Sequence, residues 1–261
     1  MTDPISAAVV NATISAYFET MTRLTEYLPG AYTRQGDAGT RLIFTTIPVA
    51  ELNAVWVGHD PDLGEVEACA REISAAGLPW SIQVRGQADP ELEKLASQYG
   101  RTVASSHPLL QWHAESLPML PAAIPHGAHV RKLSGAEEKL FAATLAAGFG
   151  MPEEVAGMLS PPALLDAPGV TAFVLDLEGE AVATGLNVLA GDHAGMYCGS
   201  VPPRYRGNGY YRALVTARLA DAVARGAHHA FSLNTPMSRP LFEAVGFRRV
   251  ETWTYLAPAI E

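Results

Sequence analysis

The sequence has little positive charge and no basic cluster of any size. Its 261 residues include 18 Lys plus Arg against 27 Asp plus Glu, which gives a formal net charge of −9. A protein that binds the nucleic-acid backbone needs a concentrated basic surface, and only short basic groups occur here, near Arg204 and Arg248. We therefore expect no nucleic-acid partner and no membrane-surface partner.

Cysteines and long apolar segments are also scarce. The two cysteines, Cys69 and Cys198, are too few for the disulfide framework of a small secreted domain. No uncharged apolar run approaches the ~20 residues that cross a bilayer, and the N-terminal segment lacks the features of an export signal. These absences predict a cytoplasmic protein, and the 48% hydrophobic content predicts a sizeable globular core.

A proline-rich, uncharged segment at residues 117–127 separates two halves, and we expect two domains at 1–120 and 128–261. The first half is the acidic one, because residues 1–125 hold 7 basic and 14 acidic side chains. Hydrophobic periodicity predicts an α/β fold with one element order in both halves, which indicates an internal repeat. The first half could equally be an unrelated α/β domain.

The expected helices and strands follow from the periodicity of apolar residues and from the positions of turn-forming residues. In the first half they are a helix at 5–27, strands at 30–34, 41–46 and 52–57, a helix at 63–76, a strand at 80–84, a helix at 90–99 and two short strands ending near 113. In the second half they are a strand at 130–133, helices after Ser134 and at 152–159, strands at 170–177, 181–189 and 194–201, a helix at 207–225, a strand at 230–233, a helix at 239–245 and a strand at 248–256.

The segment Gly199–Leu214 carries the strongest functional signal. A strand ends near Val201, and a loop with Gly207 and Gly209 leads directly into a long helix. Such a junction directs free backbone N–H groups and the positive end of the helix dipole at one point, which suits phosphate or pyrophosphate. Taken alone, the pattern also fits an ordinary helix start with two turn glycines. A dinucleotide-binding fingerprint would need glycine at Arg212, and a Walker A loop would need Gly-Lys-Ser/Thr, which does not occur.

This segment resembles the signature of the GNAT superfamily of acyl-coenzyme A dependent N-acetyltransferases, V-x-P-x-x-R-G-x-G-x-G/A-x-x-L. A second motif of the family, L-Y-E-x-x-G-F, resembles Leu241–Phe247. The resemblance covers residues 128–257 and implies a mixed, mostly antiparallel central sheet flanked by helices, here as two tandem GNAT-like domains. The residues that match the signature are Val201, Pro203, Arg206, Gly207, Gly209 and Leu214.

The resemblance implies a binding site for acetyl-coenzyme A and needs no metal. Backbone groups near the end of the strand would hold the pantetheine arm and orient the thioester carbonyl, which an amine attacks directly. The loop and the first helical turn would hold the pyrophosphate. The residues carried over are Gly199, Ser200 and Val201 for the arm, and Arg206, Gly207, Asn208, Gly209, Tyr210 and Tyr211 for the pyrophosphate.

Three positions depart from the family pattern. Tyr211 stands where the family prefers glycine or alanine, so its ring must point away from the phosphates. Phe242 replaces the tyrosine that often protonates the leaving thiolate, and we place it with the coenzyme-binding residues. Asn234 lies one residue before the asparagine that contacts the pantetheine arm in many members.

The first half lacks the phosphate loop. After the strand ending at Val57 the chain reads Gly-His-Asp-Pro-Asp-Leu-Gly, and the carboxylates of Asp60 and Asp62 would repel pyrophosphate. The resemblance therefore implies a degenerate first copy and a second copy that binds the coenzyme.

The strand at 194–201 offers the candidate catalytic side chain, Tyr197, whose alternative is a half-buried strand tyrosine. Alternation places Tyr197 and Gly199 on one face and Cys198 on the other. Cys198 is expected to be a small buried side chain, since direct transfer needs no acyl-enzyme. Asn187 and His193 are further candidates near the acyl site.

The leading hypothesis is an N-acetyltransferase that transfers an acetyl group from acetyl-coenzyme A to a primary amine of a small molecule. The acidic first half would favour a cationic acceptor, bound between the halves. The alternative is a non-catalytic acyl-coenzyme A binding, regulatory module, because Phe242 cannot donate a proton and no base is obvious. His228 and His229 are adjacent on a strand and point to opposite faces, so no metal is expected. A homodimer stays open.

Overall fold

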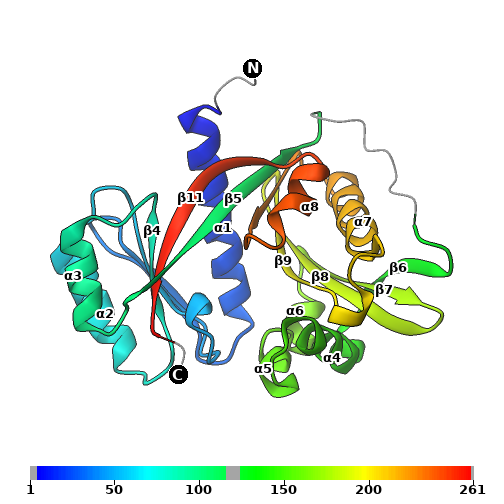
Figure 1. Cartoon of the computed structure of the whole chain (residues 1–261), viewed down its shortest axis with the longest axis horizontal. Helices are drawn as coiled ribbons and strands as arrows, with labels where there is room; N and C mark the ends of the chain where they lie inside the picture. Colours follow the sequence, from blue (N-terminus) through cyan, green and yellow to red (C-terminus); the bar gives the residue numbers. More distant parts are fainter. Residues whose placement is uncertain (1–4, 116–123, 260–261) are drawn as a thin grey trace. The chain divides into compact units, whose positions relative to one another are not determined.

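The computed structural model describes residues 5–115 and 124–259, so most of the expected linker at 117–127 lies outside the described residues. Contacts along the chain divide it into two compact units (Figure 1). Unit 1 consists of Met1–Thr20, Leu110–Ser232 and Pro240–Arg248. Unit 2 consists of Met21–Leu109, Leu233–Arg239 and Arg249–Glu261. Each unit has its own sheet region and its own helices.

In unit 1 the strands lie in the order β5-β10-β9-β8-β7-β6. Strands β6 to β9 are antiparallel to their neighbours, and β10 is parallel to β9. Helices α7 and α8 share one apolar core with β9 and β10 (Figure 1). The strands are β5 (Val103–His113), β6 (Ala128–Leu133), β7 (Val170–Leu177), β8 (Glu180–Ala190), β9 (His193–Ser200) and β10 (His229–Leu233). The helices are α4 (Glu138–Phe149), α5 (Glu153–Met158), α6 (Pro162–Leu165), α7 (Tyr210–Ala224) and α8 (Arg239–Ala244), and α1 (Ala7–Glu26) begins in this unit.

In unit 2 the strand order is β1-β2-β3-β4-β11-β5. Strands β1 to β3 are antiparallel, β4 is parallel to β3, and β11 is antiparallel to β4. Helices α2 and α3 contribute buried side chains to one core with β3 and β4. The elements are β1 (Tyr32–Gln35), β2 (Arg41–Phe44), β3 (Ala54–Val57), β4 (Ser81–Arg85), β11 (Arg248–Ala257), α2 (Leu63–Ser74) and α3 (Pro90–Gln98).

The expected mixed, mostly antiparallel α/β fold with flanking helices is confirmed. The two halves of the chain also share a pairing pattern, in which three antiparallel strands are followed by a parallel fourth. All four tryptophans are buried, as expected for core residues. Ser134 and Glu137 form a capping box at the short 3-10 turn before α4.

Two features differ from the sequence-based picture. The two short strands expected before residue 113 are one strand, β5, which continues through Pro108. The bounds of the compact units also differ from a division at 1–120 and 128–261. The end of β5 belongs to unit 1, and β11 pairs with β4 in unit 2. That division into two GNAT-like domains stays a prediction. Within the described residues no helix has the length and apolarity needed to cross a bilayer.

Candidate functional site

Strands β9 and β10 of unit 1 separate after a short paired region. Their parallel register covers three pairs, from His193↔His229 to Phe231↔Gly195. Beyond Gly195, β9 continues to Ser200 and pairs there with β8, on the side away from β10. Backbone groups on the open side of a parted strand need hydrogen-bond partners, which a bound ligand can supply. The parting therefore creates a place where an extended ligand can add to the strand.

The parted section of β9 contains a β-bulge. Pairing with β8 shifts between Leu186↔Tyr197 and Thr184↔Ser200, and Cys198 has a φ of 50°. A non-glycine residue with positive φ is strained and marks a place where the backbone is re-aimed. The predicted alternation is wrong here, because Tyr197 contacts Thr20 of α1 whereas Gly199 lies against Tyr211 of α7.

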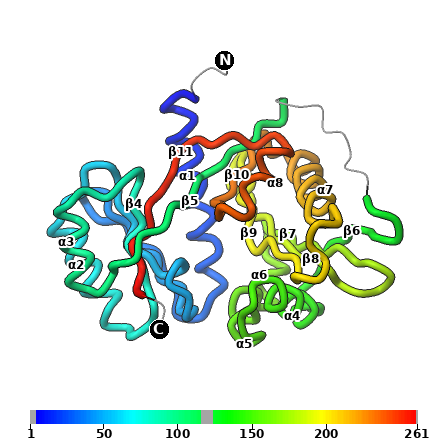
Figure 2. Tube along the Cα trace, in the orientation of Figure 1, coloured from blue at the N-terminus to red at the C-terminus, as the bar shows by residue number. Residues whose placement is uncertain are grey.

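The loop after β9 leads directly into α7 (Figure 2). The N-cap residue of α7 is Gly209, and among the described residues no side chain makes a capping hydrogen bond there. Gly207 and Gly209 have φ values of 80° and 82°, a left-handed conformation that glycine adopts without strain. The first backbone bond of the helix runs from Ala213 N to Gly209 O, so the N–H groups before it have no intrahelical acceptor. The first turn holds no acidic residue. A helix N-terminus with these features suits an anion, and the pyrophosphate site stays a prediction.

Polar side chains of the loop hold its own shape. Arg206 donates from Nε to Val201 O at 3.0 Å and from Nη2 to Gly148 O at 2.7 Å. Asn208 Nδ2 donates to the carbonyls of Tyr205 and Arg206. Ser200 is buried, and its Oγ donates to carbonyls of α4. The loop is therefore preorganised, and its backbone amides are what it offers to a ligand.

Tyr211 and Phe242 pack together on the α7 side of β9. Their rings meet edge to face with centroids 6.1 Å apart, and Phe242 is buried. The ring of Tyr211 thus turns toward the core, as expected, and its hydroxyl lies at the α-carbon of Gly199. Glycine at 199 makes room for the tyrosine at 211, since any larger residue would overlap the hydroxyl.

Arg218 is a fully buried cation that sequence reasoning missed. Its Nε donates to Asn187 Oδ1 at 2.9 Å, and its Nη2 donates to Leu186 O at 2.6 Å and Tyr197 O at 3.1 Å. Its Nη1 has no hydrogen-bond partner among the described residues. The sequence does contain a signal for this residue, because Arg218 lies on the same apolar face of the helix as Leu214 and Leu219. Arg218 joins β8 and β9 at the bulge by donating to one carbonyl of each strand, Leu186 O and Tyr197 O.

Residues 141–247 match the sequence model of the acetyltransferase (GNAT) family. They are a GNAT acetyltransferase domain. A GCN5-related N-acetyltransferase from Kribbella flavida has a similar structure, with 19% identity, a TM-score of 0.67, and coverage of 100% of this chain and 98% of that chain. A tandem GNAT protein from the clavulanic acid biosynthesis pathway covers 96% of this chain and 97% of that chain, with 13% identity and a TM-score of 0.56. At such identities the likeness shows the fold alone. A search of curated proteins gave no match.

Unit 2 does not repeat the GNAT domain's site. Its parallel strands β3 and β4 pair along all of Ala54–Val57 and do not part over that length. The N-terminus of α2 is already capped, because Asp62 accepts a hydrogen bond from Glu65 N at 2.8 Å. The absence of a pyrophosphate site from the first half stays a prediction.

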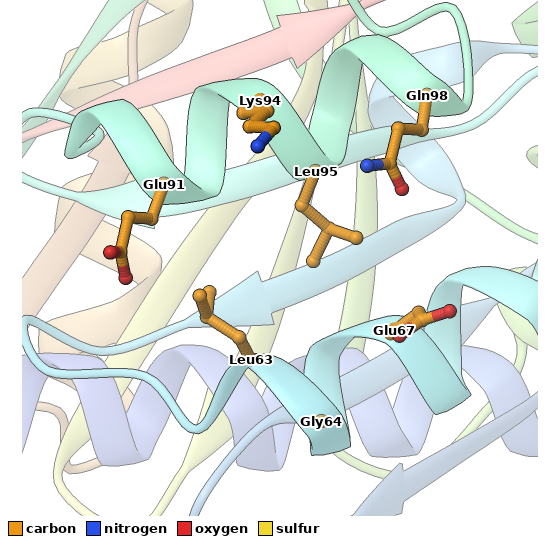
Figure 3. Close-up of a pocket in the computed structure, with 7 residues that line it drawn as sticks. All are labelled: Leu63, Gly64, Glu67, Glu91, Lys94, Leu95 and Gln98. Atoms are coloured by element: carbon orange, nitrogen blue, oxygen red, sulfur yellow. The ribbon is translucent and has the colours of Figure 1, made fainter.

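A pocket in unit 2 of about 360 Å³ lies between α2 and α3 (Figure 3). The carboxylates of Glu67 and Glu91 and the ammonium of Lys94 line it. Two acidic groups against one basic group make it a poor environment for a phosphate.

The remaining predicted residues have separate surroundings. Tyr197 is half-buried and its hydroxyl pairs with Thr20 Oγ1, and burial raises the pKa of Tyr197 well above its usual value. Asn234 is buried in unit 2, where its Nδ2 donates to Ser238 Oγ and its Oδ1 has no partner among the described residues. Burial raises the pKa of Cys198 to about 11, so its thiol stays protonated at neutral pH. The coenzyme-binding and catalytic roles of all these residues stay predictions.

Three histidines of unit 1 lie together where β9 and β10 begin. The rings of His193 and His229 stack with centroids 4.5 Å apart, and the ring of His113 lies 4.6 Å from that of His229. Asp192 pairs with His193 Nδ1 at 2.7 Å. Across the described ranges no group of three or more His, Cys, Asp or Glu is arranged to hold a metal ion. The three histidines therefore form a cluster of packed imidazole rings.

This cluster predicts an acid-sensitive stability. Burial lowers the pKa of His229 below its usual 6.5, and the nearby His193 and His113 lower it further, against an opposing effect of Asp192. The folded protein therefore takes up the proton less readily than the unfolded chain, so stability is complete above about pH 6.5 and falls as the pH drops below it. Urea unfolding between pH 8 and pH 5 should show a smaller loss in His229→Gln than in the wild type. Equal losses would contradict this role.

Proposed function

We propose that residues 128–261 bind acetyl-coenzyme A and transfer its acetyl group to a primary amine of a small molecule. The observation that carries the proposal is the combination of a parted β9 with an uncapped N-terminus of α7, joined by a preorganised glycine loop. The GNAT family match supports acetyl transfer as the chemistry. The two parts would serve different sections of one long ligand, the arm along β9 and the pyrophosphate at α7.

Under this proposal the backbone does most of the binding. The amides from Arg206 to Tyr211 were expected to hold the pyrophosphate. The N–H of Arg206 already donates to Pro203 O at 3.2 Å, so the amides from Gly207 to Tyr211 would do so, because the N–H groups at a helix start lack intrahelical acceptors. Gly199, Ser200 and Val201 would pair with the pantetheine arm along the open side of β9. No metal is required for this direct transfer.

The acceptor amine must lose a proton before it attacks the thioester carbonyl. Tyr197 cannot act as the base near neutral pH, because burial keeps its phenol protonated and its hydroxyl is paired with Thr20. It would instead orient groups at the acyl site as a hydrogen-bonding side chain. An ordered water is the simplest route for the proton to leave, and the bulk solvent would receive it.

A second candidate is a non-catalytic acyl-coenzyme A binding, regulatory module. The observation that favours it is the burial of Phe242 in the core at the position where the family often has a proton-donating tyrosine. Both functions need the same coenzyme site. They differ in turnover with an amine, so a thiol-release assay across primary, secondary and polycationic amines separates them.

The matched pair Gly209→Asp and Gly209→Asn tests the coenzyme site. Both side chains tolerate the left-handed conformation and have nearly the same shape, and the position is open to solvent. Only aspartate adds a negative charge beside the pyrophosphate. We expect calorimetric titration to show acetyl-coenzyme A binding about 100-fold weaker in Gly209→Asp than in Gly209→Asn.

The same titrations with desulfo-coenzyme A remove any contribution of the sulfur. Equal affinities of the two variants would place the pyrophosphate elsewhere, and absence of binding to the wild type would refute both candidate functions. Asp62→Asn serves as the control in unit 2, where removal of the capping carboxylate should leave coenzyme affinity unchanged.

A further inference from the structure

Helix α7 places two polar side chains at the bulge of β9, Tyr211 and Arg218. The hydroxyl of Tyr211 lies directly against Gly199, one of the residues that the proposed function assigns to the pantetheine arm, which ends in the sulfur. The ring is held from the other side by Phe242, with centroids 6.1 Å apart. Phe242 is itself fixed by Phe247, with ring centroids 5.0 Å apart. The packing of these rings therefore fixes the position of the Tyr211 hydroxyl.

A buried positive charge lies behind this hydroxyl. Arg218 stands two turns further along α7, is completely buried, and keeps its Nη1 without a hydrogen-bond partner among the described residues. The titratable groups that act on Tyr211 are Arg218 on α7 and Cys198 on β9, whereas α8 faces it with the apolar Phe242. Among the described residues, the groups that act on the Arg218 charge are Tyr211 and Cys198, neither of which is a carboxylate.

These surroundings suit a donor and not a base. Burial raises the pKa of Tyr211, and the nearby Arg218 opposes that rise only in part. The phenol therefore keeps its proton at neutral pH and can donate a hydrogen bond. An anion next to it would be stabilised both by that bond and by the guanidinium behind it.

Resting on the proposed function, we propose that Tyr211, backed by Arg218, is the hydrogen-bond donor to the sulfur of the coenzyme. When the amine nitrogen forms its bond to the acyl carbon, the C–S bond breaks and its electron pair stays on sulfur. The Tyr211 hydroxyl donates to this thiolate without losing its proton, and the proton of the product nitrogen passes to solvent. Tyr211 thereby supplies from α7 what Phe242 cannot supply from α8, and Arg218 is a positioning residue.

The test measures the ionisation of coenzyme A in a binary complex, without any turnover. Coenzyme A is bound to the wild type, to Tyr211→Phe and to the control Tyr205→Phe, and the thiolate is followed by its ultraviolet absorbance as the pH is raised. Tyr211→Phe keeps the ring that packs against Phe242 and removes only the hydroxyl. We expect the pKa of the bound thiol to be about 1 to 2 units higher in Tyr211→Phe than in the wild type or the control.

Affinity and rate complete the test. Desulfo-coenzyme A should bind the wild type and Tyr211→Phe within about twofold, because it lacks the group that the hydroxyl contacts, and kcat with a reactive amine should fall about 10-fold or more. An unchanged thiol pKa in Tyr211→Phe would overturn the inference, as would tighter coenzyme binding by Tyr211→Ala, which would make the ring an obstruction. Failure of the wild type to bind coenzyme A would instead refute the proposed function.

Discussion

Arg218→Ala is expected to lower the free energy of unfolding by about 3 kcal/mol or more. The substitution deprives Asn187 Oδ1, Leu186 O and Tyr197 O of their donors and leaves a cavity under α7. Each buried acceptor without a partner costs about 1 to 3 kcal/mol, and loss of the buried charge offsets part of this sum. Chemical denaturation followed by circular dichroism would measure the change.

Two companion variants separate the causes. Arg218→Met refills most of the cavity and still leaves the three acceptors unpaired, so it should recover about 1 kcal/mol or more relative to alanine. Arg212→Ala removes an exposed arginine of the same helix and should change stability by no more than about 0.5 kcal/mol. A small effect of Arg218→Ala would mean that water reaches the bulge and satisfies the carbonyls.

Gly199→Ala is expected to lower stability by about 2 kcal/mol and to weaken coenzyme binding at least 10-fold. A β-carbon at this position would overlap the Tyr211 hydroxyl and approach its ring, which Phe242 blocks from moving back. The displaced ring or strand would then disturb the open side of β9. Thermal unfolding and calorimetric titration of acetyl-coenzyme A report the two effects separately.

The double variant Gly199→Ala/Tyr211→Ala tests whether the two residues act as a pair. If the cost of Gly199→Ala comes from the overlap, truncation of the tyrosine removes it, and the cycle should show a coupling energy of about 1 kcal/mol or more. Additive effects would show that the cost of Gly199→Ala does not come from overlap with Tyr211.

The parts of the site that depend on local chemistry could be predicted from the sequence. Gly207 and Gly209 predict a loop with positive φ, and the helical spacing of the apolar residues after them predicts α7. Both signals depend on residues that are close together in the sequence. The expected strand from 194 to 201 agrees closely with β9. The family motif adds the ligand that such a junction would take.

The parts that depend on distant contacts could not. The predicted alternation of side chains between the two faces of β9 is wrong at Cys198. A bulge depends on the register with β8, so the sequence of one strand does not reveal it. The role of Arg218 depends on carbonyls from two strands that come together only in the fold. For the same reason the pairing of β11 with β4 could not be read from either half alone.

The late pairing of β4 has a consequence for how the chain emerges from the ribosome. Strand β4 is complete once residue 85 has been synthesised, yet its partner β11 begins only at Arg248. Throughout that interval the nascent first half carries an unpaired strand edge, which is the kind of surface that recruits strands from other chains. Folding in the cell would then depend on how fast the last segment arrives, and a ribosome stalled in the second half would leave an aggregation-prone product.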